Sequence, residues 1–431
     1  MAVCPGPRSV HVVSAIDPPP ALELPPLPSA GDRRLAVRLT KDALRHVRAG
    51  HPWVYDESIV SISHPGVAGD LAVVFDDRRR FNAIGLFDPS SPIRIKVLHR
   101  GSPATIDRAW WRERIEAALV LRAGLIEDSD TTGYRMLNGE SDGFPGLVAD
   151  RYADTVVVKV YSEAWLPHLA VVLEELIAAT GPDTVVIRTA RSMDVLGLDD
   201  GTVVFDRGGS GSAGPDDVWF VEHGLRFLAH PRGGQKTGFF LDQRDNRQRI
   251  RERSHGKNVL DLFSCTGGFS VAAAVGGANY VTSVDMSPSA IETAERVMEA
   301  NPGPSGPTPW EGIVGDAFDV MRRMKHEKRQ FGVVVVDPPS FAQRQANIAG
   351  GLRAYGNLTQ LALELVEPGG TLLQASCSSR ITAEAFFDKI HETAAASPRR
   401  VVELERTGHA VDHPVTFPEG AYLKALIARV D

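Results

Sequence analysis

Hydrophobic residues in the first part of the chain form short runs that alternate with polar residues or are rich in β-branched side chains. The runs RLAVRL, LAVVFDD, NAIGLFD and IRIKVLH are bounded by Gly, Pro and Asp, which is typical of strands. We therefore expect a small β-barrel-like domain over residues 33–104. Residues 1–31 contain eight prolines, so residues 1–32 are predicted to form a disordered leader.

The pattern becomes mixed after this region, with helical and strand-like periods in turn. The expected elements are a linking helix near 107–123, strands on both sides of a Gly-, Asp- and Pro-rich turn within 134–162, a helix over 166–179, a strand over 184–188 and a hairpin that turns at His223 and Gly224. Together they predict a linking helix and a small central α+β domain over residues 105–230.

From about residue 258 onwards, β-branched apolar runs alternate with helical segments. Strands are expected over 258–263, 280–284, 332–336, 371–375 and 421–429. This alternation favours an α/β fold with a doubly wound, mainly parallel, Rossmann-like sheet over residues 231–431. Such sheets bind ligands beyond the carboxyl ends of the strands, at the point where the strand order reverses.

The first two of these strands carry a candidate adenosine-binding motif. The segment Asn258–Asp285 reads as strand, Gly-bearing turn, helix, strand and terminal acid. Glycines let the turn approach a ligand closely, and the helix that follows offers free N–H groups at its start. Asp285 can accept hydrogen bonds from ribose hydroxyls, and the later Asp316 from an adenine amino group. The turn lacks a clean GxGxxG pattern, so a dinucleotide is poorly matched. The structural alternative is that Asp285 caps the helix beginning near Ser287.

Two later strand ends carry candidate chemistry. In VVVVDPPSF, two prolines force the chain out of the sheet in a rigid turn where Asp337 can face the crevice. In LLQASCSSR, Cys377 lies where the strand ends, and Arg380 would favour its thiolate. The alternatives are an ordinary strand-terminating turn and a buried apolar cysteine. A thiolate suits methyl transfer to carbon 5 of a pyrimidine, because its addition to carbon 6 makes carbon 5 nucleophilic.

Composition narrows the class of protein. With 431 residues, 43% of them apolar, the chain can form two or three domains, and no run of about 18 apolar residues predicts a membrane span. The cysteines Cys4, Cys265 and Cys377 form no CxxC pair, so a disulfide framework and a metal site are not expected, and a reducing cytoplasm fits best. The net charge of −7 excludes a protein that is basic throughout. Residues 33–51 nevertheless hold six Lys or Arg against one acid, and residues 232–257 hold eight against three. These stretches are compatible with phosphate contacts or with solvated charged faces.

These motifs together resemble the ribosomal large-subunit methyltransferase I family, whose members make 5-methylcytosine in 23S rRNA. The resemblance runs from about residue 36 to the end and includes HPWVYDESI, GESDGFPGLVADRY, QKTGFFLDQRDNR and DHPVTFPEGAYLKAL. It implies an amino-terminal PUA RNA-binding domain, a central α+β domain and a class I methyltransferase domain that uses S-adenosyl-L-methionine. The implied partner is 23S rRNA or a large-subunit assembly intermediate, without a membrane, and a homodimer stays open.

The resemblance also implies roles for individual residues. Cys377 would be the covalent nucleophile, and Asp337 would bind the edge of the cytosine ring. The implied cofactor-binding residues at the strand ends are Phe263, Ser264, Thr266, Gly267, Gly268, Asp285, Met286, Asp316, Ala317 and Asp337. The segment QKTGFFLDQR, expected to close over the cofactor, would add Gln235, Lys236, Thr237, Gln243 and Arg244. The implied substrate contacts are Pro338, Pro339, Ser340 and Phe341.

The sequence departs from the family pattern at two places, and three other functions stay open. Many relatives have two histidines where this chain has Ser379 and Arg380, and an aromatic residue where it has Cys265. A guanine-nitrogen methyltransferase of the same fold needs no thiol, so Cys377 discriminates against it. A 5-methyluridine methyltransferase also uses a cysteine. A non-catalytic RNA-binding assembly factor would bind no S-adenosyl-L-methionine.

Overall fold

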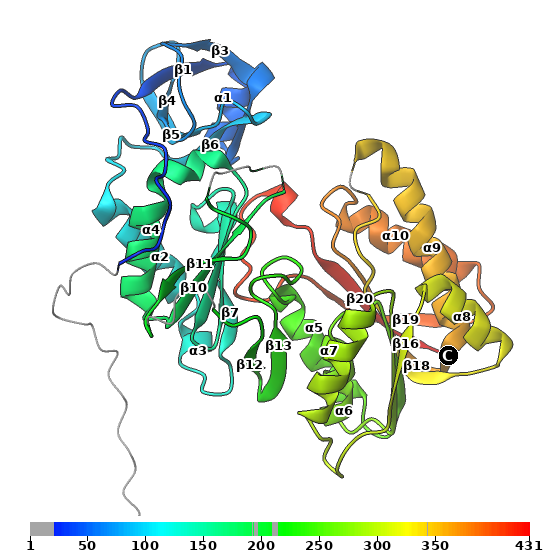
Figure 1. The fold of residues 1–431 in the computed structure, drawn as a ribbon. Helices are drawn as coiled ribbons and strands as arrows, with labels where there is room; N and C mark the ends of the chain where they lie inside the picture. The colour runs from blue at the N-terminus through cyan, green and yellow to red at the C-terminus, as the bar shows by residue number, and fades with distance from the viewer. Residues whose placement is uncertain (1–20, 192, 194–196, 209–213, 343) are drawn as a thin grey trace, which may run out of the picture.

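Three regions built around β-sheets make up the protein. The computed structural model describes residues 21–191, 193, 197–208, 214–342 and 344–431. Figure 1 shows the N-terminal domain at the top, the central domain below it, and the C-terminal domain beside the central one. Most of the predicted leader, including Cys4, lies outside the described residues. No helix in the described part of the chain is long and apolar enough to span a membrane.

The N-terminal domain is a six-stranded sheet with the order β2-β6-β5-β4-β1-β3. Its elements are β1 (Leu35–Leu39), α1 (Lys41–Arg48), β2 (Trp53–Tyr55), β3 (Ile59–Ile62), β4 (Leu71–Phe75), β5 (Phe81–Phe87) and β6 (Ile93–Arg100). Leu35, Val37 and Leu39 alternate with exposed residues along β1 and fill the core. The sequence missed α1, β2 and β3, because they are short and α1 buries only Val47.

Residues 21–32, which fall in the predicted leader, pack against the central domain instead. Leu22, Leu24 and Leu27 lie on its buried core, and the Glu23 N–H donates to the Val204 carbonyl at 2.8 Å. The prediction of disorder is therefore wrong for this segment. Its leucines, spaced between prolines, bind an apolar surface that composition alone does not reveal.

The central domain is a five-stranded sheet with the order β11-β10-β9-β8-β7 and helices on one face. Its elements are α2 (Arg108–Val120), α3 (Ala123–Ile126), β7 (Gly133–Asn138), β8 (Leu147–Tyr152), β9 (Thr155–Val160), α4 (Leu166–Thr180), β10 (Thr184–Thr189) and β11 (Thr202–Asp206). Val156 and Val158 of β9 face the core beneath the helices. Val157 between them faces a second core, which continues into the C-terminal domain. Because successive side chains of β9 point to opposite faces of the sheet, this one sheet contributes to both cores and so connects the two domains.

A hairpin of β12 (Val218–Glu222) and β13 (Leu225–Ala229) lies between the central and C-terminal domains. As predicted, it turns at His223 and Gly224, whose φ angles of 49° and 77° are those that a tight two-residue hairpin turn requires. Phe220 and Phe227 from its two strands pack in the same core as helices of the C-terminal domain.

The C-terminal domain is a seven-stranded sheet with the order β16-β15-β14-β17-β18-β20-β19. Its elements are α5 (Arg244–Arg253), β14 (Asn258–Leu262), α6 (Gly268–Val275), β15 (Tyr280–Asp285), α7 (Pro288–Glu299), β16 (Trp310–Val314), α8 (Ala317–His326), β17 (Phe331–Val336), α9 (Ile348–Leu365), β18 (Val366–Ser376), α10 (Ala383–Ala395), β19 (Val401–Thr407) and β20 (Lys424–Val430). Helices α5 to α7 cover one face and α8 to α10 the other. The predicted doubly wound α/β sheet is confirmed.

The strand order of this sheet reverses between β14 and β17, so the ligand-binding crevice is expected at their carboxyl ends. Strands β16 to β18 run parallel to β14, while β20 is antiparallel to both β18 and β19. The sequence missed β16 and β19, because their faces are half-exposed and carry few apolar residues.

The β19–β20 loop, residues 408–423, leaves the C-terminal domain and contacts both other domains (Figure 1, red). The Arg135 N–H of β7 donates to Asp412 Oδ2 at 2.8 Å. Nearer the N-terminal domain, the centres of the Phe417 and Trp53 rings lie 5.2 Å apart in an edge-to-face arrangement. This loop therefore links all three domains just before the chain enters β20.

Candidate functional site

The turn after β14 is fixed by hydrogen bonds within the protein, in which the Ser264 N–H donates to the Val284 carbonyl at 3.0 Å and the Gly267 N–H to the Ser264 carbonyl at 2.9 Å. Phe263, Cys265 and Gly267 adopt left-handed φ angles of 61°, 47° and 79°. A Cβ on Gly267 would lie 2.9 Å from the Cβ of Ala294, closer than real contacts allow. Glycine is therefore required at the start of α6 for both conformation and space.

Asp285 holds this turn against the end of β15. Its Oδ2 accepts from the Cys265 N–H at 2.9 Å, and its Oδ1 accepts from the Ser287 N–H at 2.9 Å. The cap of α7 is Ser287, whose Oγ accepts from the Ala290 N–H. Asp285 is therefore not the helix cap that the sequence left as its alternative role. It is half-buried, beside the cofactor turn.

The remaining predicted cofactor residues lie at the same edge of the sheet. Asp316 is exposed at the start of α8, where it accepts from the Asp319 N–H at 3.1 Å. Met286 is 70% exposed and Ala317 is buried. Because β14, β15 and β16 are adjacent parallel strands, their ends form one continuous rim.

The polar atoms of the turn fit a ligand that hydrogen-bonds. Ser264 is 5% exposed, and its Oγ has no hydrogen-bond partner among the described residues. Beneath it, burial raises the pKa of Asp261 to about 7, and one carboxyl oxygen of Asp261 also lacks a partner. Unsatisfied buried polar atoms are rare in folded proteins, so the Ser264 hydroxyl is a candidate contact for a bound ligand.

The ends of β17 and β18 bring the proposed chemical residues together. The Cys377 thiol donates to the Pro338 carbonyl, with an S···O distance of 3.8 Å. Asp337, the residue before, is half-buried. Burial and the Asp242 carboxylate raise the pKa of Asp337 to about 7. Burial and Asp337 in turn raise the pKa of the Cys377 thiol to about 11.

The cation that opposes this shift is Lys236, not Arg380. Lys236 lowers the pKa of Cys377, and its Nζ lies 2.9 Å from Asp242 Oδ2 and 4.4 Å from the centre of the Phe240 ring. Arg380 is exposed and is not among the groups that shift the Cys377 thiol. The expectation for Arg380 is not met, because its charge acts on Tyr55 of the N-terminal domain, where it opposes the rise of the tyrosine pKa.

The segment Gln235–Arg244 is held mainly by protein contacts. Thr237 Oγ1 donates to Asp150, and Arg244 Nη2 donates to the Gly133 carbonyl at 2.8 Å. Gln243 Oε1 accepts from Asn246 at 2.6 Å, and the Gln243 side chain lowers the pKa of Asp337. Gln235 is exposed. The structure thus brings Lys236 and Gln243 to the chemical residues, while Thr237 and Arg244 contact the central domain.

The predicted substrate residues differ in their exposure. Pro338 is buried, Pro339 is exposed, and Ser340 and Phe341 are half-buried. The Phe341 ring packs edge-to-face on Tyr355 at 5.1 Å, so it contributes to the core beneath α9. In the turn, Thr266 and Gly268 are half-buried.

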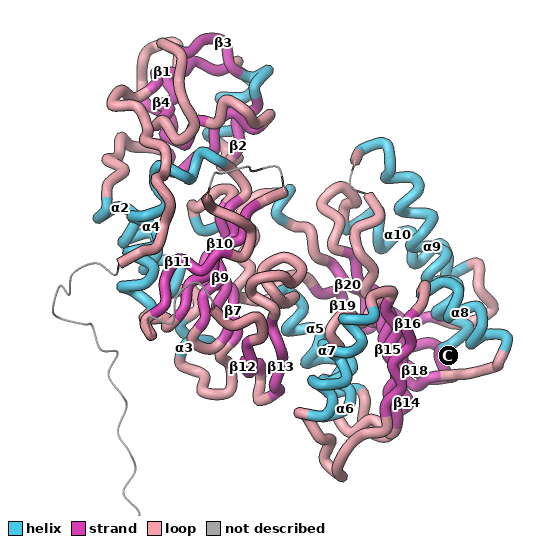
Figure 2. The backbone as a smooth tube through the Cα atoms, in the orientation of Figure 1, coloured by secondary structure: helices cyan, strands magenta, loops and turns pink. Residues whose placement is uncertain are grey.

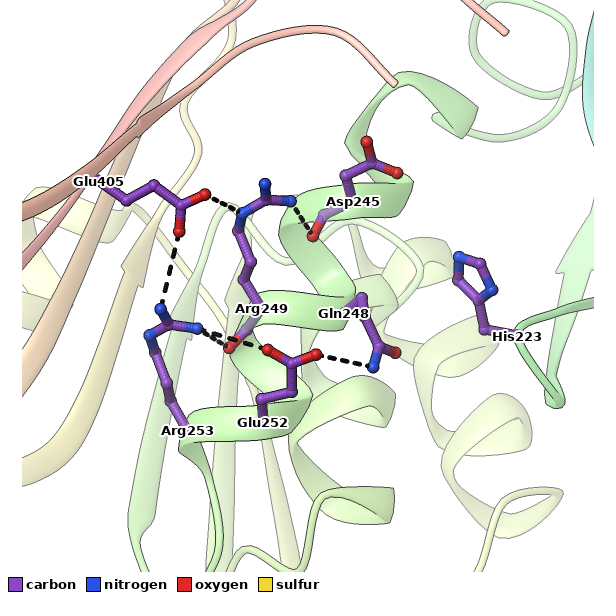
Figure 3. A pocket seen from close by; sticks show the side chains of 7 residues that line it. All are labelled: His223, Asp245, Gln248, Arg249, Glu252, Arg253 and Glu405. Atoms are coloured by element: carbon purple, nitrogen blue, oxygen red, sulfur yellow. Dashed lines mark hydrogen bonds and ion pairs between the residues drawn. The ribbon is translucent and has the colours of Figure 1, made fainter. Parts of the chain in front are cut away.

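The second basic stretch, residues 232–257, is largely neutralised within the protein. Arg247 is buried against Glu222, with Nη2···Oε2 at 2.6 Å, and Arg249 binds Glu405 at 2.7 Å. Figure 3 shows the pocket beside α5, where Arg249 and Arg253 are paired with acids. This pocket lies away from Cys377 and offers no free cationic surface.

Sequence reasoning gave no role to five residues in this part of the structure, namely Asp242, Asp412, His413, Tyr422 and Lys424. The Tyr422 hydroxyl donates to Asp242 Oδ2 at 2.9 Å, and His413 Nδ1 lies 3.0 Å from Asp412 Oδ1. Lys424 is 3% exposed at the start of β20. The motif DHPVTFPEGAYLKAL contains all of them except Asp242, but only the pairing of β20 with β18 reveals their position. Among the described residues, no group of His, Cys, Asp and Glu could hold a metal ion.

Comparison with known proteins defines the class. Residues 208–429 match the family described as S-adenosylmethionine-dependent methyltransferase, and residues 37–100 match a PUA-like domain. The fold is similar to that of an S-adenosylmethionine-dependent methyltransferase from Streptococcus mutans, with a TM-score of 0.78, 20% identity, and coverage of 91% of this chain and 99% of that one. A crystal structure of a methyltransferase complexed with SAH also has a TM-score of 0.78, at 20% identity and 92% and 99% coverage.

Curated relatives identify the family more closely. The chain is 46% identical to a protein from Deinococcus radiodurans named ribosomal RNA large subunit methyltransferase, over 94% of this chain and 99% of that one. It is 34% identical to ribosomal RNA large subunit methyltransferase I of Klebsiella pneumoniae, over 91% and 97%. The chain belongs to the ribosomal RNA large subunit methyltransferase I family and uses S-adenosyl-L-methionine.

Proposed function

We propose that this protein methylates carbon 5 of a cytosine in 23S rRNA, with Cys377 as a covalent nucleophile. The observation that carries the proposal is the position of a half-buried free cysteine directly after β18, near Asp337, the residue that follows β17. The cofactor turn follows β14, the next strand in the sheet. The candidate nucleophile, the carboxyl group and the candidate cofactor turn thus follow three adjacent strands of the sheet.

The side chains on the two strand ends have complementary roles in this reaction. S-Adenosyl-L-methionine, when bound, supplies an electrophilic methyl group. The Cys377 thiolate would form a bond to carbon 6 of the cytosine, and the electron pair of the 5,6 double bond would make carbon 5 nucleophilic. Carbon 5 would then take the methyl group, while the donor sulfur keeps the electron pair of the broken bond and leaves as S-adenosylhomocysteine. A base then removes the proton from carbon 5, the double bond reforms, and the thiolate leaves. Dividing one difficult step into these easier ones is the advantage of covalent catalysis.

Asp337 can stabilise the charge that this addition creates on the ring. Because its pKa is raised to about 7, a fraction of the carboxyl groups is protonated near neutral pH. The protonated form donates a hydrogen bond to ring nitrogen 3, which gains negative charge when the thiolate adds. A hydrogen bond that strengthens as charge develops lowers the barrier.

Several observations support ribosomal RNA as the substrate. The curated relatives named above carry that substrate in their names, and the PUA-like domain lies on the same side of the molecule as the β19–β20 loop. The target cytosine has to be single-stranded or turned out of a helix, because a paired base cannot reach a thiol in a crevice. Either naked 23S rRNA or an assembling large subunit can present such a base.

Mass-spectrometric mapping of 23S rRNA tests this proposal. Cells lacking the gene should lose one 5-methylcytosine, and the wild-type gene should restore it while a Cys377→Ala gene should not. Loss of a methylguanine or of 5-methyluridine would replace the proposal with a rival chemistry. Failure of the pure protein to bind S-adenosylhomocysteine in calorimetry would favour the assembly factor.

A further inference from the structure

Lys424 is a buried lysine whose ammonium group donates all of its hydrogen bonds to backbone carbonyls. Its Nζ donates to the carbonyls of Ser378, Ile381 at 2.6 Å and Tyr422 at 3.1 Å. The side chain is 3% exposed. Three acceptors require three N–H groups, which only the protonated form of lysine has. The geometry therefore holds Lys424 as a cation.

No carboxylate among the described residues forms an ion pair with this cation. Burying a charge without a counter-charge costs several kcal/mol, and burial lowers the pKa of Lys424 to about 8. The group that opposes this shift is the Cys377 thiolate, which raises the pKa of Lys424. An anion at Cys377 is thus the counter-charge that the site otherwise lacks.

The position of Lys424 follows from strand pairing. Lys424 is opposite Ser376 in the antiparallel β18–β20 pair, and Cys377 is the next residue along. Two of its acceptors, Ser378 and Ile381, belong to the loop that Cys377 begins. Its hydrogen bonds therefore fix the backbone on which the thiol stands.

We propose that Lys424 is a positioning residue for the methyl transfer: its ammonium fixes the loop that follows Cys377 and stabilises the Cys377 thiolate. The inference rests on the proposed function, in which that thiolate is the nucleophile. Lys424 makes no contact with the reacting base. It acts through the sulfur and through the carbonyls of the loop.

Other titratable groups face the same sulfur and have to be considered in any test. Asp337 at the end of β17 and Asp242 before α5 oppose ionisation of the thiol, while Lys236 favours it. Tyr355 from α9 and His409 from the β19–β20 loop lie nearby, facing Cys377 and Lys424 respectively. Lys424 differs from Lys236 because Lys236 already has Asp242 as its partner.

The pH dependence of Cys377 alkylation tests the proposal in the full-length protein. Iodoacetamide is applied at a series of pH values, and the peptide that contains Cys377 is quantified by mass spectrometry. At pH 7, where Lys424 is protonated, the rate in Lys424→Gln should fall about tenfold, which corresponds to a tenfold smaller fraction of thiolate. The difference from the wild type should disappear above the Lys424 pKa of about 8. Lys424→Arg, which keeps the charge, should restore most of the rate.

Two controls separate charge from structure. Lys389→Gln removes a lysine on α10 that is paired with Glu392 at 2.9 Å, and it should leave the rate of Cys377 alkylation at pH 7 unchanged. The peptide with Cys265 serves as an internal reference in every sample. An unchanged rate of Cys377 alkylation at pH 7 in folded Lys424→Gln protein would overturn the proposal.

A second measurement covers the case in which Lys424→Gln does not fold. Because the interaction of two titrating groups is mutual, Cys377→Asp, which places an anion at this position, should raise the pKa of Lys424 above about 8, as followed by nitrogen NMR of its ammonium group. An unaltered Lys424 titration would contradict the inference. If Cys377→Ala retains methyl transfer, the nucleophile assignment fails, whereas these titrations still decide whether Lys424 stabilises the thiolate.

Discussion

Arg244 Nη1 and Asp412 Oδ1 lie 2.8 Å apart in the interior, at 1% and 0% side-chain exposure. This ion pair fastens the β19–β20 loop to the start of α5, which follows the segment that carries Lys236. Arg244 and His413 hold the pKa of Asp412 far below its usual range. The loop that leads to Lys424 and the loop that carries Lys236 are therefore held by one buried contact.

Breaking this pair should destabilise the protein strongly. Asp412→Asn leaves Arg244 as a buried cation with a weakened partner, and the loss of one member of such a pair costs about 3–5 kcal/mol. Urea unfolding followed by circular dichroism measures the change. Asp154→Asn is the matched control, because its 3.5 Å pair with Arg151 is exposed and should be worth about 1 kcal/mol or less.

The same pair should make stability sensitive to acid. A carboxyl group whose pKa is depressed by folding stabilises the native state fully above its unfolded pKa of about 3.9, and the benefit is lost as the pH falls below that value. Wild-type protein should therefore lose more unfolding free energy between about pH 5 and pH 2 than Asp412→Asn does. Parallel pH profiles for the two proteins would show that Asp412 is not the group responsible.

Gly267→Ala should impair cofactor binding. Its φ of 79° disfavours a side chain, and the added Cβ would meet Ala294 at 2.9 Å, so the turn has to move. Calorimetry with S-adenosylhomocysteine should show affinity reduced by about tenfold or more. Gly181→Ala is the control, because its φ of 57° is also left-handed but its Cβ would meet nothing within 4 Å. That change should cost only about 1 kcal/mol of stability and leave affinity intact.

A substrate RNA with 5-fluorocytosine at the target position should trap the enzyme covalently. Fluorine takes the place of the hydrogen on carbon 5 that the base has to remove. Without that proton the thiolate cannot be eliminated after methylation, so the adduct persists. A band that survives denaturing electrophoresis should form with S-adenosyl-L-methionine and wild-type protein. Cys377→Ala should give none. A band of equal intensity in that variant would assign the bond to another residue.

Asp337 should shape the pH–rate profile. Thiolate increases with pH up to the Cys377 pKa of about 11, whereas protonated Asp337 declines above its pKa of about 7. The kcat/KM of the wild type should therefore rise to about pH 7 and then level off, because the gain and the loss cancel. Asp337→Asn still donates a hydrogen bond but does not titrate, so its slower rate should keep rising above pH 7. A plateau in the variant at the same pH would exclude Asp337 as the protonated donor.

Local patterns along the sequence were sufficient for much of this structure. The parallel strands of the C-terminal sheet were recognisable because buried strands need continuous β-branched runs. The His223–Gly224 hairpin was recognisable because few residue types adopt the left-handed conformations that a two-residue turn requires. The position of Cys377 at a strand end followed in the same way. Short or half-exposed elements such as β2, β16 and β19 lack that pattern and were missed.

The sequence by itself determined the fold class, the family and the strand ends at which the candidate residues stand. Only the tertiary structure decided which charges surround the sulfur. Arg380 is three residues from Cys377 and exposed, whereas Lys236 is far from it in sequence and lowers the pKa of its thiol. The reason is physical: proximity along the chain fixes only backbone direction, while strand register and buried ion pairs between distant segments determine which charged groups meet.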